Sequence, residues 1–144
     1  RVRAGTSHSF YLGVESSAMA VPGLKPKIKA LCVVPQGSEE GKKLPSVTKS
    51  FGLITGRKVD FRFFASPHRR GDSIGTIVSK PETLLEETSR LQVTLPKDKD
   101  ENSELIPVSL EAEVSEVGTL KLAMKHKNSN QKWDLEFDVR AQKP

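Results

Sequence analysis

Residues 105–140 read LIPVSLEAEVSEVGTLKLAMKHKNSNQKWDLEFDVR, and their pattern decides the fold class. Apolar and polar residues alternate from Ile106 to Val114 and again from Trp133 to Arg140. A period of two sends successive side chains to opposite faces of a strand, so each strand has one buried and one wet face. Gly118 and the run at 128–130 are turn formers between these strands. The stretch therefore predicts a three-stranded antiparallel meander.

Shorter segments of the same kind fill the front of the chain. We expect strands at residues 9–15, 28–34, 47–54, 59–63, 74–78 and 91–95, where apolar residues alternate or cluster between Pro, Gly and Ser. Residues 81–90 are the one stretch that favours a helix, of about two turns at most, since Pro81 suits a first turn. This pattern predicts an all-β fold: an antiparallel β-sandwich of about eight strands with at most one short helix.

Length and composition fit a single folded domain over residues 1–144. The net charge of +5 is scattered along the chain and only 6% of residues are aromatic, which disfavours a nucleic-acid surface. No apolar run is long enough for a membrane helix, so we expect no membrane partner. Cys32, the single cysteine, lies in an apolar run, which predicts a buried thiol.

Two further features bear on the origin of the chain. One free cysteine and the absence of an N-x-Ser/Thr site favour a cytoplasmic location. The first residue is Arg1 rather than Met, so we expect the chain to be a piece of a longer protein.

The sequence offers no recognisable catalytic or metal-binding set. His8, His68 and His126 have no His, Cys or acidic residue at a metal-ligand spacing. Ser7 and Ser9 flank His8, but neighbours on a strand point to opposite faces, so adjacency does not make a triad. Gly-rich phosphate loops are also missing. We therefore expect no enzyme in this segment, with no catalytic residues, no metal and no cofactor.

Four carboxylates in the last strands fall on the predicted wet faces. They are Glu111, Glu113, Glu136 and Asp138. An acid/base pair would need one of them in an apolar setting. Cross-strand Lys partners on a solvated face are the more common arrangement, and we expect that arrangement here.

One loop is more apolar than loops usually are. Residues 17–24 contain Met19, Val21 and Leu24. An exposed apolar loop often marks a contact site. The same side chains could instead fold onto the end of the core, and both interpretations stay open at this point.

Six segments, taken in order, carry a resemblance to a known family. They are Tyr11–Glu15, Ser73–Ile77, Val108–Val114, Gly118–Leu122, Lys127–Lys132 and Trp133–Arg140. In series they resemble the substrate-binding β-domain of the Hsp70 (DnaK-type) family, and the likeness covers nearly the whole chain. The ending is similar to a divergent bacterial branch with a shortened C-terminal region. The resemblance implies an ATP-binding ATPase domain before Arg1 in the full-length protein.

The resemblance also implies a chaperone-like domain that binds extended apolar peptide non-covalently. In the family, two loops at one end of the sandwich hold the peptide through backbone hydrogen bonds and one apolar pocket. The corresponding positions here are Met19, Ala20, Val21, Phe51, Ile54, Val59 and Phe61. The implied partners are unfolded or extended peptide and the protein's own ATPase domain.

Three departures from the family leave an alternative open. The first loop is longer and holds Pro22 and Pro26, the second loop at 55–58 is shorter, and no helical lid follows the last strand. The alternative is a non-catalytic interaction module with a degraded groove, which docks on its own ATPase domain or on another protein. Basic clusters at 57–58 and 68–70 would serve such docking. Exposed strand edges would also allow self-association.

Overall fold

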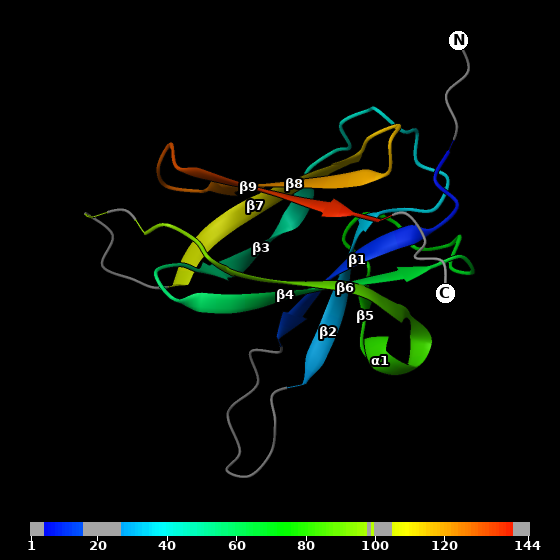
Figure 1. Cartoon of the computed structure of the whole chain (residues 1–144), viewed down its shortest axis with the longest axis horizontal. Helices are drawn as coiled ribbons and strands as arrows, with labels where there is room; N and C mark the ends of the chain where they lie inside the picture. The colour runs from blue at the N-terminus through cyan, green and yellow to red at the C-terminus, as the bar shows by residue number, and fades with distance from the viewer. Residues whose placement is uncertain (1–4, 16–26, 98, 100–104, 140–144) are drawn as a thin grey trace.

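The structure, a computed structural model, describes residues 5–15, 27–97, 99 and 105–139, with the side chains of residues 15 and 48–51 excepted. Strands dominate this part of the chain (Figure 1). They are β1 (Ser9–Glu15), β2 (Ile28–Val34), β3 (Val47–Ile54), β4 (Lys58–Ser66), β5 (Ile77–Val78), β6 (Glu86–Thr94), β7 (Leu105–Val114), β8 (Thr119–His126) and β9 (Lys132–Asp138). A single helical turn, α1 (Pro81–Leu84), precedes β6.

The strands form two antiparallel sheets. The first sheet has the order β5-β2-β1-β4-β6 and the second has the order β3-β7-β8-β9. The two sheets lie over one another as layers in Figure 1. The predicted all-β sandwich with at most one short helix is confirmed. So is the predicted meander, in which β7 pairs with β8 and β8 pairs with β9.

One expected element is wrong: most of the predicted helix at 81–90 is a strand. The helix ends at Leu84, and Leu85 already has an extended backbone with φ −127° and ψ 167°. From there β6 pairs with β4 along its length. The ladder hydrogen bonds of this pairing outweigh the weak helical propensity of a stretch rich in Thr and Ser. The strand expected at 91–95 therefore begins at Glu86.

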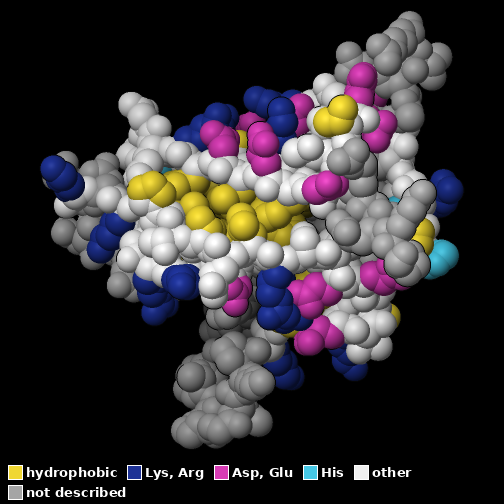
Figure 2. All heavy atoms as spheres, in the orientation of Figure 1, with side chains coloured by type: hydrophobic (Ala, Val, Ile, Leu, Met, Phe, Trp, Pro, Cys, Tyr) yellow, Lys and Arg dark blue, Asp and Glu magenta, His cyan; other side chains and the backbone are white. Residues whose placement is uncertain are grey.

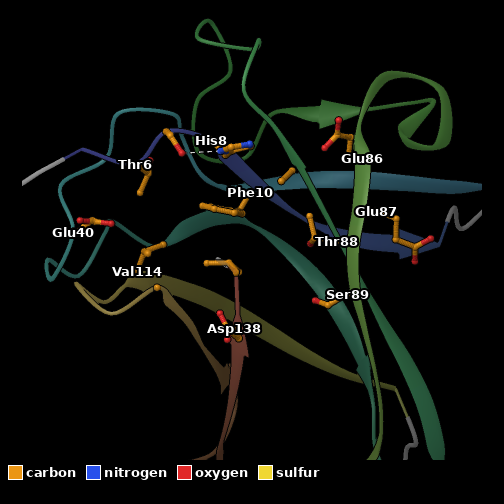
Figure 3. Close-up of a pocket in the computed structure, with 14 residues that line it drawn as sticks. Thr6, His8, Phe10, Glu40, Glu86, Glu87, Thr88, Ser89, Val114 and Asp138 are labelled. Carbon is orange, nitrogen blue, oxygen red and sulfur yellow. Dashed lines mark hydrogen bonds between the residues drawn. The ribbon is translucent and has the colours of Figure 1, made fainter. Parts of the chain in front are cut away.

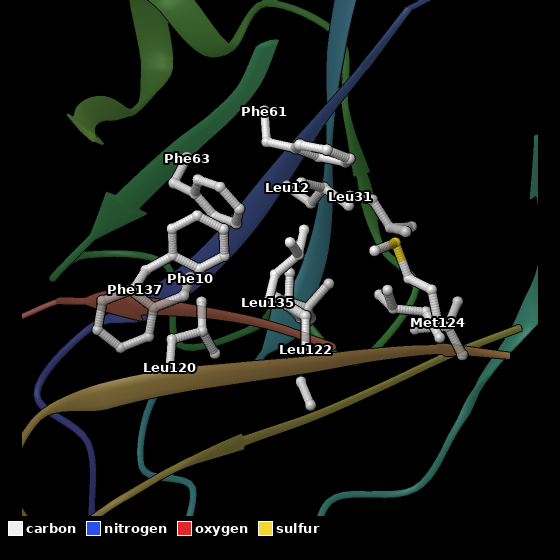
Figure 4. Packing of buried hydrophobic residues seen from close by; sticks show 14 of the residues in the cluster. Phe10, Leu12, Leu31, Phe61, Phe63, Leu120, Leu122, Met124, Leu135 and Phe137 are labelled. Carbon is white, nitrogen blue, oxygen red and sulfur yellow. The ribbon is translucent and has the colours of Figure 1, made fainter. Parts of the chain in front are cut away.

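The main core lies between the two sheets (Figure 4). Inward-facing side chains of β7 and β9 alternate with outward-facing ones, as the sequence predicted. Phe63 of β4 and Phe137 of β9 meet across the layers, with ring centroids 3.6 Å apart. Burial of large apolar side chains on both layers supplies the main driving force for the sandwich.

A second, smaller core covers the outer face of the first sheet. It consists of Tyr11, Ala30, Cys32, Phe64, Val78 and Leu85. Cys32 is fully buried there, as predicted, and burial raises the pKa of its thiol to about 12. Apolar side chains therefore pack on both faces of the first sheet.

A polar network ties the segment after β4 to this outer face. Tyr11 is fully buried, and its hydroxyl donates a hydrogen bond of 2.6 Å to Oδ2 of Asp72. Arg69 donates from Nε to the same oxygen at 2.7 Å. The Tyr11 hydroxyl also lies 2.8 Å from the Ser9 hydroxyl. A buried hydroxyl with two partners is well satisfied, so this network holds the segment in one position.

The outer face of the second sheet is a charged surface, as expected. Glu111 accepts hydrogen bonds from Lys125 Nζ at 3.1 Å and from Ser46 Oγ at 3.0 Å. The Lys125 and Ser46 hydrogen bonds lower the pKa of the Glu111 carboxyl. Lys121 of β8 stands between Glu113 of β7 and Glu136 of β9. The predicted cross-strand Lys partners are therefore present.

Candidate functional site

The residues predicted for peptide binding fall partly outside the described part of the chain. Met19, Ala20 and Val21 lie outside the described residues. Phe51 belongs to β3, where its backbone stands opposite Val108 of β7, but its side chain is not among those described. The structure therefore places the side chains of the remaining three positions.

Ile54, Val59 and Phe61 flank the turn between β3 and β4. Phe61 is 9% exposed and belongs to the main core, where Figure 4 shows its ring among the other core side chains. Val59 is half-buried and packs against that core, and Ile54 is half-buried at the end of β3. The structure brings Val59 and Phe61 together as core residues. Neither they nor Ile54 line the cavities of about 520 Å³ and 210 Å³ that other described residues form.

A more open apolar surface lies along one side of the sandwich. β6 is the last strand of the first sheet and β9 is the last strand of the second. Figure 2 shows a band of apolar side chains exposed along the gap between these edges. The inward-facing residues here are Leu91 and Val93 of β6, which are half-buried, and Leu135 and Phe137 of β9. We refer to this gap, with those four side chains, as the seam.

The backbone of the two edge strands adds a second feature to the seam. Within the described residues, β6 pairs only with β4 and β9 pairs only with β8. Each strand therefore presents a row of backbone N–H and C=O groups on its outer side. Such a row is a template for pairing with another extended chain.

One end of the seam is closed by hydrogen bonds between the layers. The indole Nε1 of Trp133, at the start of β9, donates to the carbonyl oxygen of Pro96 at 3.0 Å. Leu95, just past the end of β6, is 4% exposed and completes the apolar closure. The two sheets are thus held together at this end.

The opposite end of the seam widens into a cavity of about 520 Å³ (Figure 3). Its apolar walls include Phe10 of β1, Val114 at the end of β7 and Val139 just after β9. Residues 86–89 of β6 form another wall. The cavity is therefore a continuation of the seam, reached between the same two edge strands.

Acidic groups surround the cavity. Glu40, Glu86, Glu87 and Asp138 all line it. Glu87 accepts two hydrogen bonds from Arg62, at 2.9 Å from Nε and 3.0 Å from Nη2, and a third from Arg90 at 3.2 Å. The Arg62 hydrogen bonds, followed by those from Arg90, lower the pKa of Glu87 to about 2. A carboxylate bound in this way is fixed in position and charged at any physiological pH.

A hydroxyl–imidazole pair also lines the cavity. Ser7 Oγ lies 2.8 Å from Nδ1 of His8, because both residues precede β1 and are not constrained by strand alternation. The sequence analysis did not predict this contact. It correctly expected that Ser9 would not pair with His8, and the Ser9 hydroxyl is instead hydrogen-bonded to the hydroxyl of Tyr11. In the described part of the chain no carboxylate is hydrogen-bonded to His8, so the pair lacks the orienting third member of a triad.

The described ranges contain no group of three or more His, Cys, Asp or Glu side chains that could hold a metal ion. The seam offers the backbone groups of two edge strands and apolar side chains for binding. Its residues were not predicted as a site, because the sequence does not show which strands lie at the edges of the two sheets. One sequence feature could have indicated the seam. Residues 133–140 form the last strand of a predicted meander, and such a strand has a neighbour on one side only.

Comparison with known proteins does not assign a family or a function to the chain. No protein-family model matches the chain, and no curated protein matches it. Among the residues that the structure describes, no helix has the length and apolar character needed to cross a membrane.

Proposed function

We propose that this domain binds an extended apolar peptide segment non-covalently, as a chaperone-like module. The single observation that carries the proposal is the seam, where the half-buried side chains of Leu91 and Val93 border a gap between two edge strands. Exposed apolar bands of this kind mark interaction sites on soluble domains. The seven residues of β9 span about 24 Å, enough for a peptide of similar length in an extended conformation.

The chemistry of such binding follows from the two features of the seam. Backbone hydrogen bonds to an edge strand give affinity that tolerates many sequences, and apolar side chains in the gap give selectivity for apolar residues. Half-buried Leu91 and Val93 would lose their remaining contact with water on binding. The resemblance to the Hsp70 substrate-binding β-domain supports the same function, although it points to the loops that contain Met19–Val21 and residues 55–58 and not to the seam.

The same proposal covers the longer protein to which the domain belongs. On the resemblance, the chain is part of a longer, cytoplasmic DnaK-like protein whose ATPase domain lies outside these residues. Hydrolysis of ATP would then belong to that domain, and this one would act only by binding.

The test is fluorescence anisotropy of a labelled, Leu-rich extended peptide titrated with the domain. Saturable binding in the micromolar range is expected, and Leu91→Lys should weaken it at least about tenfold, because the substitution places a charge in the apolar gap. The matched control is Leu84→Lys on α1, where the leucine is 51% exposed and lies outside the seam.

Two results would speak against the proposal. One is no binding up to the solubility limit; the other is equal weakening by Leu91→Lys and Leu84→Lys. If Leu91→Lys fails to fold, Val93→Thr provides a milder change of nearly the same shape, and it should weaken binding without unfolding the domain.

A second function is favoured by a different observation. At the predicted loop site, Phe61 belongs to the main core and Val59 packs against it. Packing of these side chains against the rest of the domain favours the interaction module that docks on its own ATPase domain or another protein. Lys58, His68 and Arg70 are exposed and could contact such a partner. Binding of the isolated ATPase domain by this chain, unaffected by Leu91→Lys, would support this second function. Binding that falls steeply with salt would instead indicate nucleic acid.

A further inference from the structure

The outward-facing side of β9 is mostly acidic. Asp134, Glu136 and Asp138 alternate along the strand with the buried Trp133, Leu135 and Phe137. All three acidic side chains are exposed. Figure 2 shows acidic side chains bordering the apolar band on its upper side. Lys132, at the start of the strand, is the one basic residue of β9; it lies on the same face and forms an ion pair with Asp134, with Nζ 3.7 Å from Oδ1.

We propose that the open edge of β9 accepts, as an added strand, an extended segment in which apolar residues alternate with Lys or Arg. This inference rests on the proposed function and names the class of peptide that the seam selects. A strand added beside β9 continues the sheet β3-β7-β8-β9, and its side chains alternate between the two faces of that sheet.

The inward-facing half of the added strand would fill the seam. Alternate side chains would point between the layers, against Leu91 and Val93 on the facing edge and beside Leu135 and Phe137 on β9. This environment is apolar on both sides, so apolar residues are required at every second position of the segment.

The outward-facing half would lie beside the acidic row. Residues directly opposite on paired strands have Cβ atoms about 5 Å apart, so opposite charges attract and like charges destabilise the pair. Lys or Arg at the remaining positions would face Asp134, Glu136 and Asp138. At the far end the segment reaches the cavity, whose rim carries Glu86 as well. The preference for a basic segment therefore holds from Asp134 to the end of the strand at Asp138.

The edge of β6 does not make the same selection. Its exposed residues include Glu86, Thr88, Arg90, Gln92 and Thr94, a mixed row without one sign of charge. Glu87 is already engaged by Arg62 and Arg90. Selectivity for a basic segment thus belongs to β9.

A second copy of the chain fits this edge poorly. Antiparallel pairing of β9 with the β9 of another molecule would place two acidic rows against each other. This pairing is therefore disfavoured, and the occupant of the β9 edge is a segment of different, basic character.

The experiment compares three labelled peptides that share the same Leu and Val residues and alternate them with Lys, Ser or Glu. We expect the Lys peptide to bind at least about tenfold more tightly than the Ser peptide, and the Glu peptide to bind most weakly. In about 1 M salt, where the screening length is about 3 Å, the three affinities should converge. A fourth peptide, with the same Lys and apolar residues in two separate blocks, should bind no better than the Ser peptide.

Variants of the protein locate the effect. Asp134→Lys with Glu136→Lys should reverse the order of the Lys and Glu peptides. The control, Asp60→Lys with Glu82→Lys, changes the net charge equally at exposed positions away from β9 and should keep the original order. Thermal unfolding of each variant checks that it folds.

The outcomes separate this inference from the proposed function. If all the alternating peptides bind with equal affinity, or if the blocked peptide matches the alternating Lys peptide, the inference is wrong and the proposed function stands. If no peptide binds, the proposed function fails as well. Retention of the Lys preference in the Asp134→Lys, Glu136→Lys variant would also contradict the assignment to β9.

Discussion

Glu87 shows how single side chains define the open end of the seam. Its carboxylate is held by Arg62 from the neighbouring strand β4 and by Arg90 three residues further along β6. The two arginines neutralise the acid and fix its position at the cavity wall. Because the pKa of Glu87 is lowered to about 2, the carboxylate contributes stability only while it stays ionised.

The pH dependence of unfolding tests this arrangement. The contribution of Glu87 should be fully present above about pH 4.5, its ordinary pKa, and should be lost as the pH falls through the folded-state value of about 2. In urea unfolding between pH 6 and pH 2, Glu87→Gln should therefore lower stability at pH 6 and flatten its decline below pH 4.5.

Glu82→Gln is the matched control for this series. Its side chain is 67% exposed and lies 3.6 Å from Arg62, so it should keep the decline of the wild-type protein, because exposed ion pairs contribute little. An unchanged decline in Glu87→Gln would show that the arginine contacts do not stabilise the fold.

Val59 and Phe61 show what the sequence could not establish about single residues. The alternation at 59–63 correctly identified side chains that share one face of a strand. It could not tell whether that face borders a groove or the core, since both are apolar. In the structure Phe61 belongs to the main core and Val59 packs against it.

At the scale of elements, the turn between β7 and β8 depends on one glycine. Gly118 has φ 82°, in the left-handed region, and its N–H donates to the Ser115 carbonyl at 3.1 Å. Ser115 Oγ also accepts from the N–H of Thr119 at 3.0 Å. The turn sets the register of the meander that includes β9, so its geometry bears on the seam.

Gly118→Ala should destabilise the domain by about 1 to 2 kcal/mol, because an L-residue in this region brings Cβ close to the following carbonyl. Gly71→Ala is the control: no atom lies within 4 Å of the added Cβ and φ is not positive, so stability should be unchanged or slightly higher. Chemical denaturation measures both, and equal effects of the two substitutions would contradict the role of the turn.

The strands were predicted well where alternation is long and wrongly where it is short. Residues 105–140 alternate over many positions, and β7, β8 and β9 lie where the sequence placed them. At 81–90, Pro81 correctly signalled a helix start, but pairing with β4 converts the chain to strand from Glu86. Pairing between segments distant in sequence is not visible in local propensity, and the seam was missed for the same reason.

At the scale of the whole molecule, the sandwich is asymmetric. The outer face of the first sheet is covered by the second core, and the outer face of the second sheet is charged and wet. The side between β6 and β9 is the one where apolar side chains meet water in Figure 2. The net charge is +5, yet this side is bordered by acidic groups, so its electrostatics differ from those of the molecule as a whole.

The location of bound peptide is the most direct test of the account. Hydrogen–deuterium exchange should be measured for the domain alone and with a saturating peptide that alternates Lys and Leu. We expect slower exchange across Lys132–Asp138, because an added strand protects the amides of the edge that it joins, and no change at residues 54–61. Slower exchange confined to residues 16–26 and 54–61, with β9 unchanged, would contradict the seam and return the site to the loops.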